Sequence, residues 1–338
     1  MGVNLKPIIS ARKIEISDLS GKIVAIDAFN AIHQFIAIIR QIDGTPLKDR
    51  NGNITSHLSG IFYRTANLVE YGIKPVYVFD GQPHPLKLRV LKKRKETREI
   101  AREEWEEALR EGNMEEALKK AKRSGTINEE IISQSKELLH YLGIPYIEAR
   151  GEGEAQAAYM NIKGDVYGVA SQDFDALLFG AKALIRNLAI TGRRKISGKQ
   201  AYIEVFPEEI ISDKVLEENG ISREQLVDVA ILTGTDFNEG VKGIGPKKAL
   251  NLIREYGRIE NLIEKNILQI EGYEEVRKIF LEPDINYDYN LKWEEIDEKE
   301  TIRFMCDEHN FNRERVLNAI EKYRNFAKNL KQKNLFDF

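Results

Sequence analysis

The sequence contains little cysteine, no long apolar run and no paired histidines. A single cysteine, Cys306, among 338 residues excludes an intrachain disulfide framework and a cysteine-rich zinc site. No apolar run approaches the ~18 residues of a membrane span, and residues 1–13 lack the apolar core of a secretory signal. The five histidines show no HExxH-like spacing. We therefore expect a soluble protein of a reducing compartment, with no membrane partner.

Neither sign of charge dominates the chain, but the charges are segregated locally. The sequence has 51 Lys and Arg residues against 54 Asp and Glu residues, a net charge of −3. Residues 87–102 contain eight basic side chains and two glutamates, whereas residues 103–116 contain seven glutamates and one arginine. A net charge near zero argues weakly against a nucleic-acid-binding protein. Because the charges are segregated, the net charge does not decide the question.

Three apolar runs rich in β-branched residues predict the core. They cover residues 22–27, 75–80 and 165–170, and segments of helical period such as 57–71 and 129–142 lie between them. Short buried strands that alternate with helices predict an α/β fold with a mostly parallel central sheet and helices on both faces. Residues 183–190 and 201–206 predict a β-hairpin, and the pattern is helical from residue 222 to the end.

We expect six parts along the chain. Residues 1–81 and 129–221 would form the α/β core, and residues 82–128, which are highly charged and favour helix, would form an insertion that stands off the sheet. Residues 222–257 predict two helices joined by a glycine-rich turn, and residues 258–327 predict further helices. Residues 328–338 have no periodicity of their own and predict a flexible tail.

Acidic residues follow the predicted strands, at the edge where open α/β sheets place their sites. The candidates are Asp27, Asp80, Glu152, Glu154, Asp173, Asp175 and Asp236. Acids that converge without basic partners are tolerable mainly with bound cations, and all-oxygen ligands select hard ions such as Mg²⁺ or Mn²⁺. Two such ions ~4 Å apart can position a water and stabilise the leaving oxygen in phosphodiester hydrolysis.

An ordinary explanation of these acids stays open at this point. A single Glu-x-Glu or Asp-x-Asp pair is usually a solvated or helix-capping feature. Asp173 and Asp175 would point the same way only on an extended backbone. Asp27 and Asp80 are harder to explain in this way, because each closes an apolar strand where a bare carboxylate is costly.

The glycine-rich segment 240–250 is a second candidate site, between helices predicted at 223–233 and 246–256. Gly243 and Gly245 would let backbone N–H groups approach a phosphate at a helix N-terminus, where Lys247 and Lys248 add positive charge. The alternative is an ordinary turn with a glycine cap. The pattern favours a helix-hairpin-helix that binds the DNA backbone without reading bases.

Six segments together resemble the structure-specific 5′ nucleases and, within them, the archaeal and eukaryotic flap endonucleases. The segments are IDAFNAIHQF (26–35), ITSHLSGIFYRT (54–65), GIKPVYVFDGQP (72–83), EARGEGEAQAAYM (148–160), SQDFDALLFG (171–180) and ILTGTDFNEGVKGIGPKKAL (231–250). They follow the family's order over about residues 1–250.

The resemblance implies a PIN-like nuclease core in which the seven acids hold two Mg²⁺, directly or through water, with Mn²⁺ as a substitute. It implies that residues 82–128 form a helical gateway for the single-stranded 5′ flap. Lys87 and Arg94 match the family's basic pair that touches the scissile phosphate, and a spacing of seven places them on one helix face. Gly2, once Met1 is removed, matches the small N-terminal residue near the site and is counted among the residues expected to bind DNA.

The resemblance also assigns residues to DNA. Thr55 and Arg64 fall in the segment that grips the duplex and a one-nucleotide 3′ flap. The glycine-rich segment matches the helix-two-turn-helix, which holds the downstream duplex and often K⁺. His33 stands where the family commonly has a tyrosine that stacks on the base next to the scissile bond, a departure that weakens stacking.

The last residues resemble the box QxxLxxFF by which the family binds the sliding clamp (PCNA). The matching residues are Gln332, Leu335 and Phe338, and the chain ends at the first terminal aromatic. The alternative is a frayed basic tail. No long basic extension follows, so the resemblance implies an archaeal-type enzyme of the cytoplasm that is a monomer by itself.

We therefore expect a Mg²⁺-dependent endonuclease that cuts branched DNA at the base of a 5′ flap and leaves a 5′-phosphate and a 3′-hydroxyl. By resemblance it would act in Okazaki-fragment maturation and long-patch base excision repair. The family rivals are a processive 5′ exonuclease, a bubble-cutting repair nuclease and a junction resolvase. A gateway of about 45 residues favours flap cutting over bubble cutting.

Two alternatives lie outside the nucleases. A haloacid-dehalogenase-type phosphatase would need an acid two residues after Asp27, where the chain has Phe29. A non-catalytic scaffold for branched DNA and the clamp would lose acids that are all present here.

Overall fold

The computed structural model describes residues 2–41, 43–121, 126–190, 192–195 and 202–336. Their centre is a seven-stranded sheet in the order β1-β9-β6-β5-β2-β3-β4. Its strands are β1 (Arg12–Lys13), β2 (Ile23–Asp27), β3 (Lys74–Phe79), β4 (Tyr146–Glu148), β5 (Gly168–Ala170), β6 (Ala183–Arg186) and β9 (Glu208–Ile211). Strands β6, β5, β2, β3 and β4 are parallel, and only the β1–β9 and β9–β6 pairs of this sheet are antiparallel. The prediction of a mostly parallel sheet is confirmed.

Both faces of the sheet are buried, which explains why its strands are continuous apolar runs rather than alternating ones. Along β2, Val24 and Ile26 enter one hydrophobic cluster and Ala25 enters the other. The helices α1 (Ala28–Ile38), α2 (Ser56–Glu70) and α5 (Glu129–Tyr141) supply the first cluster. The helices α6 (Gly153–Lys163) and α7 (Asp175–Leu178) supply the second.

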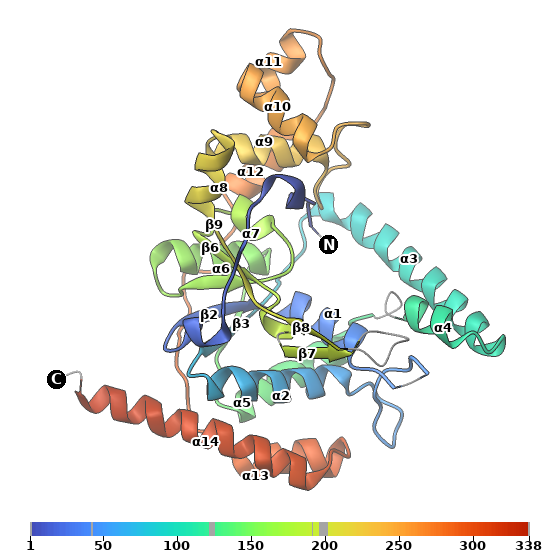
Figure 1. Cartoon of the computed structure of the whole chain (residues 1–338), viewed down its shortest axis with the longest axis vertical. Helices are drawn as coiled ribbons and strands as arrows, with labels where there is room; N and C mark the ends of the chain where they lie inside the picture. Colours follow the sequence, from blue (N-terminus) through green and yellow to red (C-terminus); the bar gives the residue numbers. More distant parts are fainter. Residues whose placement is uncertain (1, 42, 122–125, 191, 196–201, 337–338) are drawn as a thin grey trace.

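A long helix projects from this core between the two ends of the molecule (Figure 1). It is α3 (Pro85–Arg110), which begins with proline in its first turn and packs at its far end on α4 (Met114–Ala121). The chain turns between them at Gly112, whose φ of +72° suits glycine. The prediction of a helical insertion that stands off the sheet agrees with this arrangement.

Helices continue the chain beyond the sheet. They are α8 (Ser212–Asn219), α9 (Arg223–Thr233), α10 (Pro246–Tyr256), α11 (Ile259–Glu264), α12 (Tyr273–Leu281), α13 (Glu298–Ile302), a π-helical turn (Arg303–Glu308) and α14 (Arg313–Phe336). The prediction that this region is helical throughout was wrong for residues 282–297, which are without regular structure. This strap lies across the core, where Trp293 Nε1 donates to the Pro75 carbonyl at 2.8 Å. No helix of the described residues is long and apolar enough to cross a bilayer.

Two other predictions of local structure were wrong. Residues 183–190 do not form the first strand of a hairpin, because the buried strand β6 joins the central sheet; the hairpin pairs β7 (Gly192–Lys195) with β8 (Tyr202–Val205) instead. Residues 328–336 continue α14 rather than form an irregular tail. Leu330 packs on the core beneath this helix, and Lys331 pairs with Glu295 on the strap.

Candidate active site

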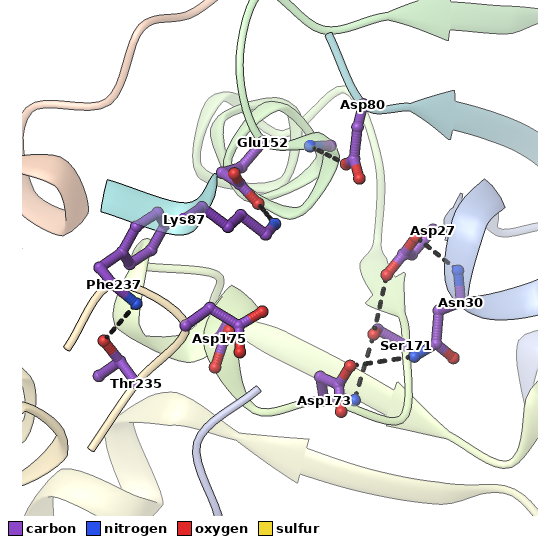
Figure 2. A network of polar contacts seen from close by, with 12 residues as sticks. Asp27, Asn30, Asp80, Lys87, Glu152, Ser171, Asp173, Asp175, Thr235 and Phe237 are labelled. Carbon is purple, nitrogen blue, oxygen red and sulfur yellow. Dashed lines mark hydrogen bonds and ion pairs between the residues drawn. The ribbon is translucent and has the colours of Figure 1, made fainter. Parts of the chain in front are cut away.

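The seven predicted acids come from different elements and meet at the carboxyl edge of the parallel strands. Asp27 ends β2, and Asp80 directly follows β3. Glu152 and Glu154 flank the first residue of α6, whereas Asp173 and Asp175 lie in the loop after β5 and at the start of α7. Asp236 follows α9. In Figure 2 the five of these acids that are labelled point toward a common space.

The Asp-x-Asp geometry differs from the prediction. Asp173 lies in a bend, and Phe174 between the two acids has helical φ and ψ, so the backbone is not extended here. The two carboxylates nevertheless repel each other, because both face the same cluster of acids from a short loop. Proximity of the elements, rather than alternation along a strand, brings this pair together.

Burial and repulsion between neighbouring carboxylates raise the pKa values of Asp27, Glu154 and Asp175. Burial, followed by the charge of Asp80, raises the pKa of Asp27 to about 7. Burial, followed by the charge of Asp236, raises the pKa of Asp175 to about 8. Burial and the charge of Asp175 hold the pKa of Glu154 well above its usual range. The cluster therefore needs positive charge before all its members can ionise at neutral pH.

Two basic side chains of α3 supply part of that charge. Lys87 Nζ pairs with Glu152, and Arg94 Nη2 lies 2.5 Å from Asp236 Oδ1. Lys87 lies in the first turn of α3 and Arg94 in the third, on the same face of the helix. Both side chains can therefore reach the acids. Glu152 and Asp236 therefore each have a basic partner, and the argument for bound cations applies chiefly to the other acids. The charge of Lys87 also opposes the rise in the pKa of Asp80 that burial causes.

The donor set fits a hard divalent cation, although the side chains form no complete coordination shell. Glu154 Oε1 is buried and has no hydrogen-bond partner in the described part of the chain, and such an oxygen is costly unless a cation or water satisfies it. All seven side chains offer oxygen, which suits Mg²⁺ or Mn²⁺. Among the described residues, no three His, Cys, Asp or Glu side chains stand as a ready-made metal centre.

The N-terminus closes one side of the acid cluster. The Val3 N–H donates to Asp175 Oδ1 at 3.0 Å. A Cβ built on Gly2 would lie 2.3 Å from the same oxygen, so only glycine fits against Asp175 without movement. The structure thus places Gly2 beside the acids, where the resemblance expects it.

The residues expected to bind duplex DNA lie on two separate helices, α10 near the top of Figure 1 and α2 in its lower part. Lys247 and Lys248 are exposed in the first turn of α10, behind Gly245 at its N-cap and Gly243 with φ +80°. Thr55 is buried at the N-cap of α2, and Arg64 is half-buried on the same helix.

His33 lies on α1 under the projecting helix. Its Nε2 lies 3.2 Å from Arg98 Nη2. Burial, followed by the charge of Arg98, lowers the pKa of His33 to about 3, so the ring is neutral. In the sequence, Arg98 is marked only as a member of the basic run at 87–102. Its spacing of four from Arg94 places it on the same helix face and could have singled it out.

The predicted clamp-binding residues belong to the end of the chain. Gln332 and Leu335 belong to α14 by their backbone. Phe338 lies outside the described residues.

Comparison with known proteins connects this architecture to a family. The XPG N-terminal domain matches residues 1–101, and the XPG I-region matches residues 143–236. Flap endonuclease 1 of Pyrococcus horikoshii is 52% identical over 336 residues, which span 99% of this chain and 97% of that protein. Flap endonuclease 1 of Methanosarcina acetivorans is 48% identical over 335 residues, 99% of each chain.

Solved structures agree with the sequence relatives. Flap endonuclease-1 from Methanococcus jannaschii superposes with a TM-score of 0.78 at 41% identity, over 97% of this chain and 99% of that chain. The catalytic core of Rad2 in complex with DNA substrate shares the fold, with a TM-score of 0.70 at 24% identity over 94% of this chain and 97% of that chain. Fold and site define a nuclease with an α/β core and an acid-lined centre. Within that class, the chain belongs to the flap endonucleases of the XPG family.

Proposed function

We propose that this protein is a 5′ flap endonuclease that hydrolyses one phosphodiester at the base of a 5′ flap in branched DNA. The observation that carries the proposal is the meeting of Lys87 and Arg94 with the acids at the foot of α3. Cations that bind a phosphate and carboxylates that hold ions are the two sets of groups that this hydrolysis needs. The relatives that span the whole chain carry the same activity in their names.

Lys87 and Arg94 would bind the scissile phosphate, because an ammonium and a guanidinium attract anions and offer several donors. Each must first exchange its carboxylate partner for the phosphate oxygens. The seven acids would hold two Mg²⁺, or Mn²⁺ in their place, and such ions lower the pKa of the attacking water and stabilise the leaving oxygen. The products would be a 5′-phosphate and a 3′-hydroxyl.

The two groups of DNA-binding residues would hold two duplex arms on either side of the cut. The exposed Lys247 and Lys248 at the N-terminus of α10 would bind the phosphates of one DNA arm. The glycine-rich turn that precedes α10 would also bind K⁺. Thr55 and Arg64 would hold the other arm with its one-nucleotide 3′ flap. The neutral ring of His33 would stack on the base beside the scissile bond.

The remaining parts of the proposal concern partners and setting. Gln332, Leu335 and Phe338 would bind the sliding clamp, and the enzyme would act as a cytoplasmic monomer in DNA replication and repair. The parts along the chain would be a core (1–81 and 129–221), a gateway (82–128), the helix-two-turn-helix (222–257), a helical part (258–327) and the clamp-binding end (328–338).

Cleavage of a 5′-labelled double-flap DNA tests the proposal. The protein is incubated with Mg²⁺, with EDTA, and as Asp173→Ala with Mg²⁺. We expect one short labelled product that is absent from both controls. Binding of the DNA without any cut in Mg²⁺ or Mn²⁺ would reject the enzyme and favour a non-catalytic scaffold.

A further inference from the structure

A ring of hydrogen bonds connects two of the acids through one neutral residue, Asn30 (Figure 2). Its backbone N–H donates to Asp27 Oδ1 at 3.0 Å, and its side-chain Nδ2 donates to Asp173 Oδ2 at 3.2 Å. Ser171 Oγ closes the ring, since it donates to Asp27 Oδ2 at 3.2 Å and accepts from the Asp173 N–H at 3.2 Å. One residue of α1 thus touches acids from two different elements.

The orientation of the Asn30 amide is fixed from behind. The backbone N–H of Gln172 lies 3.2 Å from Asn30 Oδ1, and Gln34 Nε2 donates to the same oxygen. A backbone N–H can only donate, so this end of the amide is the oxygen and the end that faces Asp173 is the nitrogen. The Asn30 amide therefore cannot flip, and its nitrogen faces Asp173 as a donor.

A neutral donor does something for Asp173 that a cation cannot. Lys87 and Arg94 pair with Glu152 and Asp236 and thereby cancel part of the charge of those acids. The Asn30 amide fixes the direction of Asp173 but leaves its full negative charge. An acid that is oriented and still charged binds a cation at lower cost, because no counter-ion has to be displaced.

We propose that Asn30 is a positioning residue that orients Asp173 for a divalent ion and joins it to Asp27. The proposal rests on the proposed ligand role of these acids. Removal of the Asn30 side chain leaves its backbone bond to Asp27 in place, so of these two acids only Asp173 loses a donor. Partners that orient metal ligands typically change metal affinity about 10-fold to 100-fold. We expect Asn30→Leu, which keeps the shape but removes the donor, to weaken ion binding about 10-fold.

The first measurement is the affinity of the DNA-free protein for Mn²⁺ alone, from the EPR signal of the free ion. Wild type, Asn30→Leu and Gln34→Leu are compared with Asn318→Ala, an exposed residue of α14. We expect wild-type affinity for Asn318→Ala, the largest loss for Asn30→Leu, and a smaller loss for Gln34→Leu, which removes one of the two donors behind Asn30. Melting curves check the fold, and Asn30→Ala replaces Asn30→Leu if the leucine is not accommodated.

The second measurement separates positioning from a general structural defect. Single-turnover cleavage of double-flap DNA is followed against Mg²⁺ concentration. A positioning role raises the half-saturating Mg²⁺ of the Asn30 variant by the factor seen for Mn²⁺, and excess Mg²⁺ restores the rate. A deficit that excess Mg²⁺ does not restore would overturn the proposal. Equal Mn²⁺ affinity in the variant and the wild type would overturn it and leave the nuclease proposal intact, whereas a wild type that binds no Mn²⁺ would overturn both.

Discussion

A methyl group on Gly2 is the smallest change that the acid cluster should not tolerate. A Cβ there would lie 2.3 and 2.4 Å from the two carboxylate oxygens of Asp175 and 2.5 Å from its Cγ. Ordinary contacts of a Cβ begin at 3.4 Å, so Gly2→Ala forces a separation of about 1 Å. The N–H of Val3, bonded to Asp175 Oδ1 at 3.0 Å, must stretch or break in the same movement.

The expected cost follows from that displacement. A misplacement of about 1 Å at a reacting centre lowers the rate on the order of 100-fold, which is about 2.7 kcal/mol of activation free energy. The assay is single-turnover cleavage of a double-flap DNA at saturating Mg²⁺, with the dissociation constant of the same DNA measured in parallel. Asn4→Ala is the matched control, because its side chain lies on the same terminus but is exposed.

The result should separate chemistry from binding. Gly2→Ala should bind the double-flap DNA with wild-type affinity and cut it slowly, whereas Asn4→Ala should do both normally. Mass spectrometry must show that Met1 is removed equally from all proteins. A Gly2→Ala protein that cuts within about threefold of wild type would refute the contact between Gly2 and Asp175 on which the estimate depends.

Four further predictions follow from other contacts. Lys87→Met should slow cleavage about 100-fold or more with little change in DNA affinity; an unchanged single-turnover rate would contradict a role at the phosphate. Lys247→Ala should lower the slope of log Kd against log salt by about 1, and an unchanged slope would place this lysine away from the DNA backbone. Asp228 is 2% exposed, and its two carboxylate oxygens lie 2.8 and 3.0 Å from the guanidinium nitrogens of Arg277. Arg277→Leu removes this guanidinium and should lower the free energy of unfolding, measured in urea, by about 3–5 kcal/mol. A loss below about 1 kcal/mol would contradict a buried ion pair. In EDTA, the free energy of unfolding should fall as pH rises from about 4 to about 8. The pKa of Asp175 is raised to about 8 in the folded protein, which therefore keeps a proton that the unfolded chain has lost over this range. Mn²⁺ should remove this fall, and a flat profile in EDTA would show that the acids ionise freely.

The sequence predicts the buried strands and the strongly capped helices of this fold well. The runs at 22–27 and 75–80 became β2 and β3, and the two helices around the glycine-rich turn have the predicted bounds, 223–233 and 246–256. These elements carry their own signals, such as an apolar run, a capping serine at 222 or a proline at 246. Local patterns of this kind need no knowledge of the partner.

The wrong predictions concern elements whose structure depends on distant partners. Strand β6 reads like half of a hairpin, and its place beside β5 follows from pairing with a strand earlier in the chain. The end of α14 has a weak pattern, and its contacts to the core and to Glu295 are invisible in the local sequence. Propensity is a weak guide wherever tertiary packing selects the structure.

The acids of the site were identifiable from the sequence, but their partners were not. Strand ends mark Asp27 and Asp80, and the family motifs mark the others. The pairing of Glu152 with Lys87 needs the fold, because 65 residues separate them along the chain. Asn30 lies within a quoted motif, yet an asparagine at the third position of a helix has no distinctive signal until Asp173 is brought to it.

The acids differ in the kind of partner that holds them, and this difference bears on how the proposed reaction could begin. Neutral N–H donors hold four acids: Asn30 for Asp27 and Asp173, Gly153 for Asp80 and Val3 for Asp175. Cations of α3 hold two others, Glu152 and Asp236. A neutral donor loses nothing when a cation arrives at its acid, whereas an ammonium or guanidinium is repelled by that cation and attracted by a phosphate. The neutral contacts should therefore persist as a fixed frame, and the Lys87 and Arg94 contacts should exchange when ions and DNA bind. On this argument α3 is coupled to the acids through two contacts, Lys87 with Glu152 and Arg94 with Asp236, that the substrate itself can replace.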